Sequence, residues 1–321
     1  MEKKLKIVFL NIYQNKHNRG TETFITELSK RLSTDFDIDV ISKVNYFKIL
    51  TGKYDLVIPT NGRFQVFITR LICWLSGAKM VVSGHSGLGA DDKWNLLCFP
   101  NRFVAFTEFQ KKWAHKFNPF VKLAKIPNGV DLKKFNNKQS LSLRDKNKPL
   151  KIDLPRPIVL VVGALDTNKR LDLAIKAVAK TNASLLLVGK GALEKELKEL
   201  GENLMPGRFK IMSFTFNEMP RVYASAHLFT YPTVPWESFG IVLIEAMASG
   251  LAVIATDDEI RKEIVGGAGY FVDPTDTEKY TEVLDKALKT KWGEIPRKQA
   301  QKFDWDEIAE KYKELFNELI T

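Results

Sequence analysis

Short apolar runs alternate with amphipathic stretches along most of the chain. Residues 21–32 place Phe24, Ile25, Leu28 and Leu32 at helical spacing, which predicts a helix. The apolar runs predict strands at 6–11, 38–41, 56–58, 80–82, 103–105, 157–162, 184–188, 228–231 and 251–254. Because most of these runs are continuously apolar, they are typical of parallel strands covered by helices on both faces. The pattern therefore predicts an α/β protein with two such sheets in series, that is, two Rossmann-like domains.

A polar segment separates the two sets of predicted strands. Residues 136–157 are rich in Lys, Asn, Ser and Pro and show no apolar periodicity, which indicates a linker or an exposed loop. We expect an N-terminal domain over residues 1–150 and a C-terminal domain over 151–303. Residues 304–321 are predicted to form a closing helix, since apolar residues recur there at helical spacing.

The net charge of +11 is unevenly placed. Residues 1–150 contain 26 Lys and Arg but 12 Asp and Glu, a net charge of +14, whereas the remaining residues carry −3. This asymmetry favours an anionic partner such as lipid headgroups, phosphorylated acceptors or nucleic acid. Lysine-rich surfaces also serve solubility alone. No recognition motif accompanies the charge, so we expect no specific binding of nucleic acid.

The apolar runs are too short to span a bilayer, which needs about 20 residues. The longest candidate, 64–82, is interrupted by Gln65, Arg70 and Lys79, and the apolar run at the N-terminus is too short for a signal peptide. Two cysteines without metal-like spacing suit a reducing compartment. We therefore expect a cytoplasmic location.

Two stretches mix apolar and basic residues. Residues 64–75 surround Arg70 with large apolar side chains, and residues 111–117 combine three lysines with Trp113 and Phe117. Such stretches can lie in a membrane interface, but the first is more typical of a buried helix in a Rossmann-like domain. We expect it to be buried, with peripheral binding to the anionic inner face of the cytoplasmic membrane as the alternative.

Residues 235–250, PWESFGIVLIEAMASG, carry the sharpest chemical signal. Glu245 lies in an apolar helix-like run, where an unpaired carboxylate costs free energy. The turn formed by Ser238, Phe239 and Gly240 would aim backbone N–H groups at an anion, as the N-termini of helices do. The alternative is a surface Glu237 and a helical Glu245 on a domain that binds no nucleotide.

This segment resembles the pattern P-x-x-x-E-S/G-F-G-x-x-x-x-E-A-M-A-x-G of the family 4 glycosyltransferases, which have the GT-B fold. Three further segments resemble the same family in the same order, namely 18–22 (NRGTE), 126–131 (IPNGVD) and 162–170 (VGALDTNKR). The resemblance covers nearly the whole chain. It implies two Rossmann-like domains that face each other across a cleft, with the C-terminal helix crossing back to the N-terminal domain.

The resemblance implies that the donor is a nucleotide diphosphate sugar. Breaking the glycosidic bond leaves negative charge on the β-phosphate, so catalysis favours a fixed cation and N–H dipoles there. Lys169 is predicted to supply the cation. By resemblance, Glu245 holds the ribose hydroxyls and Glu237 those of the transferred sugar. The remaining donor contacts are predicted at Gly20, Gly163, Ser238, Phe239, Gly240 and Ile241.

The chain departs from the family pattern at Ala164, where relatives often have an arginine after Gly163. Arg170 or another cation is expected to replace the missing charge. The turn at Gly189 resembles the one beside the nucleotide base, although any Rossmann-like domain needs a glycine there.

His85 follows the predicted strand 80–82, and by resemblance it contacts the donor sugar. The adjacent pairs Asp91-Asp92 and Asp257-Asp258 do not have the spacing with which carboxylates hold one cation. We therefore expect no metal and no cofactor beyond the nucleotide sugar.

The sequence thus predicts a metal-independent glycosyltransferase, and the resemblance alone implies that it is a retaining enzyme. It would move a hexosyl group from a UDP- or GDP-sugar to a glycan, lipid-linked or small polyol acceptor. One alternative is a catalytically inactive nucleotide-sugar-binding protein, which Ala164 favours. The other is a basic nucleic-acid-binding protein, which the charge of residues 1–150 favours.

Overall fold

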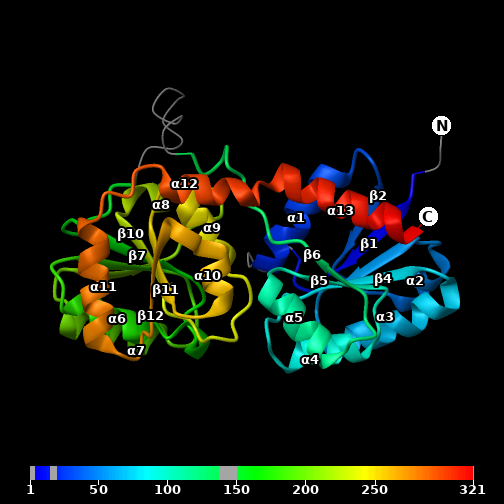
Figure 1. Cartoon of the computed structure of the whole chain (residues 1–321), viewed down its shortest axis with the longest axis horizontal. Coiled ribbons are helices and arrows are strands. Elements are labelled where there is room, and N and C mark those ends of the chain that lie inside the picture. Colours follow the sequence, from blue (N-terminus) through cyan, green and yellow to red (C-terminus); the bar gives the residue numbers. More distant parts are fainter. Residues whose placement is uncertain (1–3, 15–19, 137–149, 321) are drawn as a thin grey trace. The chain divides into compact units, whose positions relative to one another are not determined.

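The computed structural model describes residues 4–14, 20–136 and 150–320. The chain divides into an N-terminal unit, Met1–Gly129 with Trp305–Thr321, and a C-terminal unit, Val130–Asp304. Each unit is built around one six-stranded parallel sheet, so the predicted α/β class is confirmed (Figure 1). Most of the linker expected over 136–157 lies outside the described residues.

The sheet of the N-terminal unit has the strand order β2-β1-β3-β4-β5-β6. Its strands are β1 (Lys6–Leu10), β2 (Asp37–Ile41), β3 (Leu56–Pro59), β4 (Lys79–Ser83), β5 (Arg102–Ala105) and β6 (Leu123–Lys125). The first five correspond to predicted strands. The sixth was missed because its three residues, Leu-Ala-Lys, contain no apolar run.

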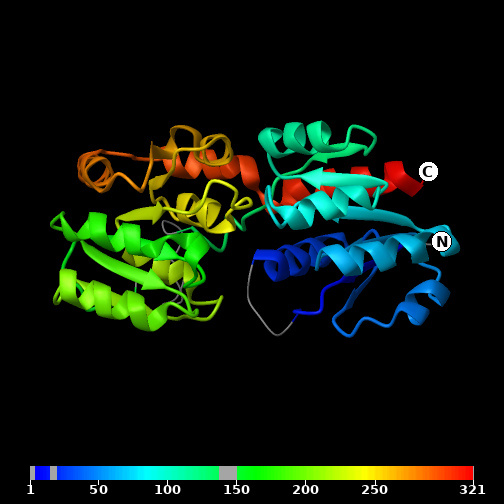
Figure 2. The same ribbon diagram turned by 90° about the horizontal axis from the view of Figure 1, so that it is seen from below.

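Helices cover both faces of this sheet (Figures 1 and 2). Ile7 and Phe9 point to one face and pack with α1 (Gly20–Leu32) and α13 (Trp305–Ile320). Val8 and Leu10 point to the other face, as the alternation of side chains along a strand requires. The helices on that second face are α2 (Tyr46–Thr51), α3 (Arg63–Ser76), α4 (Ala90–Leu97) and α5 (Glu108–Phe117).

The last helix is part of the N-terminal core, as the resemblance implied. Trp305 is 1% exposed and packs beside Phe24 of α1, with ring centroids 6.0 Å apart. A Cβ atom added at Gly129 would lie 2.4 Å from the Trp305 ring. The glycine of the segment 126–131 therefore makes room for this tryptophan.

The C-terminal unit has the strand order β12-β11-β10-β7-β8-β9. Its strands are β7 (Ile158–Val162), β8 (Ser184–Val188), β9 (Phe209–Met212), β10 (Leu228–Tyr231), β11 (Val253–Thr256) and β12 (Gly269–Val272). Its helices are α6 (Leu171–Ala179), α7 (Glu194–Leu204), α8 (Met219–Ser225), α9 (Ile241–Ala248), α10 (Glu259–Val265), α11 (Thr277–Lys289) and α12 (Ile295–Ala300), with the short 3-10 turns η2 (Thr167–Lys169), η3 (Gly266–Ala268) and η4 (Gln301–Phe303). Strands β9 and β12 were not predicted, and β11 begins two residues later than expected.

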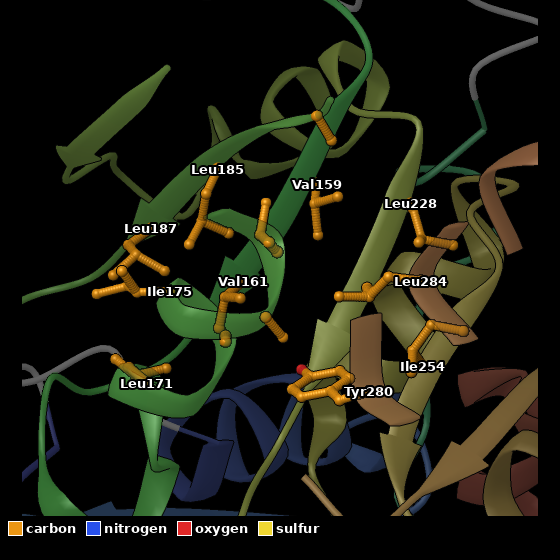
Figure 3. Packing of buried hydrophobic residues seen from close by; sticks show 14 of the residues in the cluster. Val159, Val161, Leu171, Ile175, Leu185, Leu187, Leu228, Ile254, Tyr280 and Leu284 are labelled. Carbon is orange, nitrogen blue, oxygen red and sulfur yellow. The ribbon is translucent and has the colours of Figure 1, made fainter. Parts of the chain in front are cut away.

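One face of this second sheet is packed by aliphatic side chains from the central strands. Val159 and Val161 of β7 and Leu185 and Leu187 of β8 lie in a buried cluster with Ile175 of α6 (Figure 3). The hydroxyl of Tyr280, which enters the cluster from α11, is hydrogen-bonded to Thr230 Oγ1 at 2.5 Å. Its one polar atom is therefore satisfied inside an apolar core.

The expectation that residues 64–75 form a buried helix is wrong for half of that helix. α3 buries Val66, Ile72 and Cys73 against the sheet, yet it exposes large apolar side chains on its other side. Phe64 is 74% exposed and Trp74 is 68% exposed. Periodicity alone could not show this, because both sides of the helix are apolar.

We predict that Trp305→Ala lowers the free energy of unfolding of the N-terminal unit by about 3–5 kcal/mol, because it leaves a cavity under α13. Denaturant unfolding followed by circular dichroism would measure the change. Trp94→Ala is the matched control, since Trp94 is 56% exposed in the same unit. Equal unfolding midpoints for the two variants would contradict the packing described here.

Candidate functional site

The structure brings Lys169 and Glu237 together, although 68 residues separate them in sequence. Lys169 ends the 3-10 turn η2, which follows β7 and is capped by Asp166, whose carboxylate accepts from the backbone N–H of Lys169 at 3.3 Å. Glu237 lies in the loop between β10 and α9. The Lys169 Nζ atom donates to Glu237 Oε2 at 2.7 Å, and both side chains are largely buried.

The ring of Tyr231 connects this ion pair to the N-terminus of α9. Lys169 Nζ lies 5.8 Å from the ring centroid, and a Cβ atom added at Gly240 would lie 3.0 Å from the same ring. Gly240 has a φ of +75°, which favours glycine, so both its backbone and its neighbour restrict this position. Burial opposes the charge on Lys169, but Tyr231 and Glu237 outweigh it, and the pKa of the ammonium is raised.

The N-terminus of α9 is suited to an anion. Gly240 has no side chain to cap the helix, and the first N–H groups of any helix lack acceptors within it. These groups and the helix dipole favour negative charge, with Lys169 close by. Phe239 contributes packing, because its buried ring lies 5.8 Å from that of Phe303.

Glu245 lies one turn further along α9 and is 6% exposed. The Tyr223 hydroxyl donates to its Oε2 atom at 2.8 Å. Burial raises the pKa of the Glu245 carboxyl to about 7, although this hydrogen bond lowers it. The Glu245 carboxyl therefore gains or loses its proton near neutral pH.

Arg170 donates hydrogen bonds to the loop that follows β10. Its Nε atom donates to the carbonyl of Pro232 at 2.9 Å, and Nη2 donates to the carbonyl of Thr233 and to Thr256 Oγ1 at 3.4 Å. The structure therefore gives Arg170 a positioning contact in place of the open cation that would compensate for Ala164.

Arg261 was missed by the sequence reasoning and holds the same loop more completely. Its guanidinium is fully buried. Nη1 donates to the carbonyls of Glu237 and Ser238, at 2.9 and 2.8 Å, and Nη2 donates to those of Val234 and Pro235. Nε pairs with the Asp258 carboxylate at 2.8 Å. No pattern in the sequence distinguishes this arginine from Lys262 beside it, which is exposed.

Gly163 and Gly189 are explained by the packing of two turns. A Cβ atom added at Gly189 would lie 1.8 Å from the carbonyl oxygen of Gly163, and the Gly163 N–H donates to the carbonyl of Val188 at 3.0 Å. A Cβ atom at Gly163 would touch the Lys169 side chain, 3.6 Å away. These glycines allow the turns after β7 and β8 to approach each other.

Two predicted site residues, His85 and Gly20, belong to the N-terminal unit. The His85 ring packs edge-on against Phe24 and Phe106, with ring centroids 4.8 and 4.9 Å apart, and its buried Nε2 atom has no hydrogen-bond partner among the described residues. Burial lowers the pKa of His85 to about 3, so the ring is neutral at physiological pH. Gly20 begins α1, and residues 15–19 before it lie outside the described part of the chain.

In the described ranges, no three His, Cys, Asp or Glu side chains gather as ligands for a metal ion. The helices described also include none that is long and apolar enough to cross a bilayer.

Comparison with known proteins settles the family. Residues 144–311, more than half of the chain, match the family model of glycosyl transferases group 1. The chain belongs to this family. The segment that matches includes Lys169, Glu237, Glu245 and Arg261, so the whole cluster described above lies inside the family region.

Two relatives of this group 1 family member match parts of the chain. The sulfoquinovosyl transferase SQD2 of Arabidopsis thaliana is 28% identical over 193 residues, which are 55% of this chain and 36% of the relative. A GDP-mannose-dependent phosphatidylinositol monomannoside mannosyltransferase of Corynebacterium glutamicum is 28% identical over 175 residues, 51% of this chain and 46% of the relative. The chain thus spans less than half the length of each.

The solved structure of Anabaena Alr3699/HepE in complex with UDP and glucose superposes with a TM-score of 0.78 at 18% identity, and it covers 98% of this chain and 100% of that one. At this identity the likeness shows the fold. The fold of this group 1 family member is GT-B, as predicted.

We predict that Glu245→Gln changes how stability depends on pH. The folded-state pKa of Glu245 is about 7, above its ordinary value of 4.5, so between these values the folded chain holds a proton that the unfolded chain has lost. Stability should therefore fall as the pH rises through this window, by about 3 kcal/mol more in the wild type than in the variant. Denaturant unfolding across the pH range, without nucleotide, measures this. The exposed Glu202→Gln serves as control, and parallel curves for wild type and Glu245→Gln would contradict the assignment.

We further predict that Arg261→Lys lowers the free energy of unfolding of the C-terminal unit by about 3–5 kcal/mol, because one ammonium cannot reach four carbonyls and a carboxylate. Denaturant titration would show the loss. Lys262→Ala removes a neighbouring positive charge at the surface and should leave the unfolding midpoint unchanged. A wild-type midpoint in Arg261→Lys would show that the loop does not depend on the guanidinium.

Proposed function

We propose that the protein is a glycosyltransferase that moves a hexosyl group from a UDP- or GDP-sugar to an acceptor with retention of configuration. The observation that carries the proposal is the pair of Lys169 and Glu237 beside the N-terminus of α9, in a chain of this family. A fixed cation and helix N–H groups meet the need of a departing diphosphate, which gains negative charge as its bond to the sugar breaks.

When the donor binds, Lys169 would exchange its partner Glu237 for the diphosphate. Without a ligand, Glu237 keeps the Lys169 ammonium charged and in place. A diphosphate would compete for the ammonium, since phosphate oxygens accept strong charge-assisted hydrogen bonds. The Glu237 carboxylate, still held by the Arg261 contacts to its loop, would then accept hydroxyls of the transferred sugar.

Glu245 is proposed to accept the two ribose hydroxyls. A carboxylate offers two oxygens for such a pair of donors. Its raised pKa means that the ionised form costs free energy while the site is empty. Hydrogen bonds from a nucleotide would favour that form, so nucleotide binding and loss of the proton would be linked.

The transfer is proposed to need no bound metal, because Lys169 and the N-terminus of α9 supply the charge stabilisation. In the retaining reaction, the acceptor oxygen attacks the anomeric carbon from the side that the diphosphate leaves. The bond to the β-phosphate oxygen breaks, and the acceptor proton passes to the departing phosphate. The nucleotides named for HepE and for the Corynebacterium relative, UDP and GDP-mannose, support a donor of either kind.

The acceptor is proposed to be a glycan, a lipid-linked sugar or a small polyol. The Corynebacterium relative is named for a phosphatidylinositol mannoside, which supports a lipid acceptor. We also propose that the N-terminal unit contacts an anionic membrane. The exposed apolar side of α3 and the excess of basic residues in 1–129 support this contact.

We predict that one of UDP, GDP, ADP and CMP binds the purified protein tightly by calorimetry. Lys169→Met and Glu245→Ala should each weaken this binding about 10- to 100-fold, because each removes a charged hydrogen-bonding group. Lys176→Met on α6 is the control, since its ammonium pairs with Asp172 at the surface and should not matter.

Glu237→Gln tests whether Glu237 contacts the transferred sugar in addition to holding the Lys169 ammonium. It should weaken binding of the nucleotide sugar more than binding of the free nucleotide, because the proposed Glu237 contact is to the sugar. If none of the nucleotides binds the wild type, the proposed donor site is wrong.

A further inference from the structure

A basic pocket of about 410 Å³ opens in the N-terminal unit, and none of the predicted donor residues lines it. Its lining includes Arg70 of α3, Lys79 and Arg102 at the starts of β4 and β5, and Lys122 just before β6. The pocket therefore lies at the amino ends of these strands. His85 follows the carboxyl end of β4, so it lies at the opposite ends of the strands of the same sheet.

The positive charge in this pocket is poorly compensated. Glu318 pairs with Arg102 Nη2, and it is the one acidic side chain in the lining. Arg70 Nη1 donates to the neutral Asn101 Oδ1 at 3.0 Å. Within the residues that the structure describes, no carboxylate pairs with Arg70, Lys79 or Lys122. The pocket has four cations and one anion, so an anionic ligand would be favoured.

Two nitrogen atoms of the arginines in the lining also lack acceptors. The Nε atoms of Arg70 and Arg102 are both buried, and neither has a hydrogen-bond partner in the described chain. Burial lowers the pKa of the Arg70 guanidinium, although Cys73 and Cys98 oppose this shift. Guanidinium groups bind phosphate with two parallel hydrogen bonds, so the two arginines suit a phosphate ligand.

An apolar surface adjoins the pocket. The Arg70 guanidinium lies 5.2 Å from the ring of Trp74, which faces outward from α3. Phe120, part of the pocket lining, is 84% exposed. α3, α4 and α5 lie side by side on this face of the sheet (Figures 1 and 2). Their other exposed apolar side chains are Phe64, Phe67, Leu71, Leu75, Trp94, Leu97, Phe109 and Phe117.

We propose that this pocket binds the phosphate headgroup of an anionic membrane lipid while the apolar side chains of α3 enter the interface. Exposed aromatic and aliphatic residues beside basic ones are typical of interfacial binding. A second copy of the chain fits less well, because a two-fold interface through this surface would bring two basic pockets into one interface. The inference rests on the membrane contact proposed above and is independent of nucleotide binding.

Sedimentation with phosphatidylcholine vesicles, with and without phosphatidylglycerol, tests the proposal. The wild type should bind the anionic vesicles, and Arg70→Gln with Arg102→Gln should weaken this binding about tenfold or more. Lys195→Gln with Lys289→Gln is the matched control, since it removes two exposed charges from the C-terminal unit and should bind as the wild type does. Phe120→Ser should also weaken binding, and it cannot disturb folding because its ring is so exposed.

The proposal is wrong if the wild type does not bind anionic vesicles. Three further results would also overturn it. The first is that the arginine variant and Phe120→Ser both bind these vesicles as tightly as the wild type does. The second is calorimetric binding of glycerol 1-phosphate as tight as vesicle binding, which would assign the pocket to a free phosphate. The third is a dimer in light scattering that Trp74→Ser dissociates, which would assign the surface to a second copy. UDP and GDP titrations of the same preparations report on the C-terminal unit, so failure of the proposed transferase activity would be seen separately.

Discussion

The buried guanidinium of Arg261 is the interaction on which the candidate site depends. It donates to four backbone carbonyls of residues 234–238, of which that of Val234 also accepts from the Glu237 N–H, and so it fixes the conformation of their loop. By binding all four, the arginine places Glu237, and Glu237 in turn holds Lys169. Arg170 fixes the preceding residues 232 and 233 in the same way. The two arginines thus hold the backbone of the loop. The side chains available to contact a ligand are those of Lys169, Glu237 and Glu245.

The two units use charge in opposite ways. In the C-terminal unit the charged groups of the site are buried and partnered, so that each is held in position before a ligand arrives. In the N-terminal unit the basic groups of the pocket beside α3 are only partly matched, and the apolar side chains next to them are exposed. Arg70 stands between these features, since it lines the pocket and contacts the ring of Trp74. The C-terminal unit thus has charged groups that partner one another, and the N-terminal unit has a basic pocket beside an exposed apolar surface.

Much of the fold could be predicted because it depends on local pattern. Continuous apolar runs identified nine strands, and helical spacing identified α1 and α13. Strands β6, β9 and β12 were not predicted, because they are short or mixed in composition and take their stability from neighbouring strands. The opposite error occurred at α3, where an apolar sequence was expected to be buried. A helix that is apolar on both sides has one side against its sheet, and its own sequence does not reveal what lies against the other.

The sequence by itself determined the family and the α/β class, because these depend on motifs and apolar runs of residues close together in the chain, and it named Lys169, Glu237 and Glu245 as candidates. The tertiary structure decided which distant residues meet. It paired Lys169 with Glu237 and Glu245 with Tyr223, turned Arg170 toward the carbonyls of a loop, and buried Arg261 beneath that loop. It also packed the His85 ring between two phenylalanines. Such contacts depend on how helices and loops pack on a completed sheet, and no residue carries that information in its immediate neighbours.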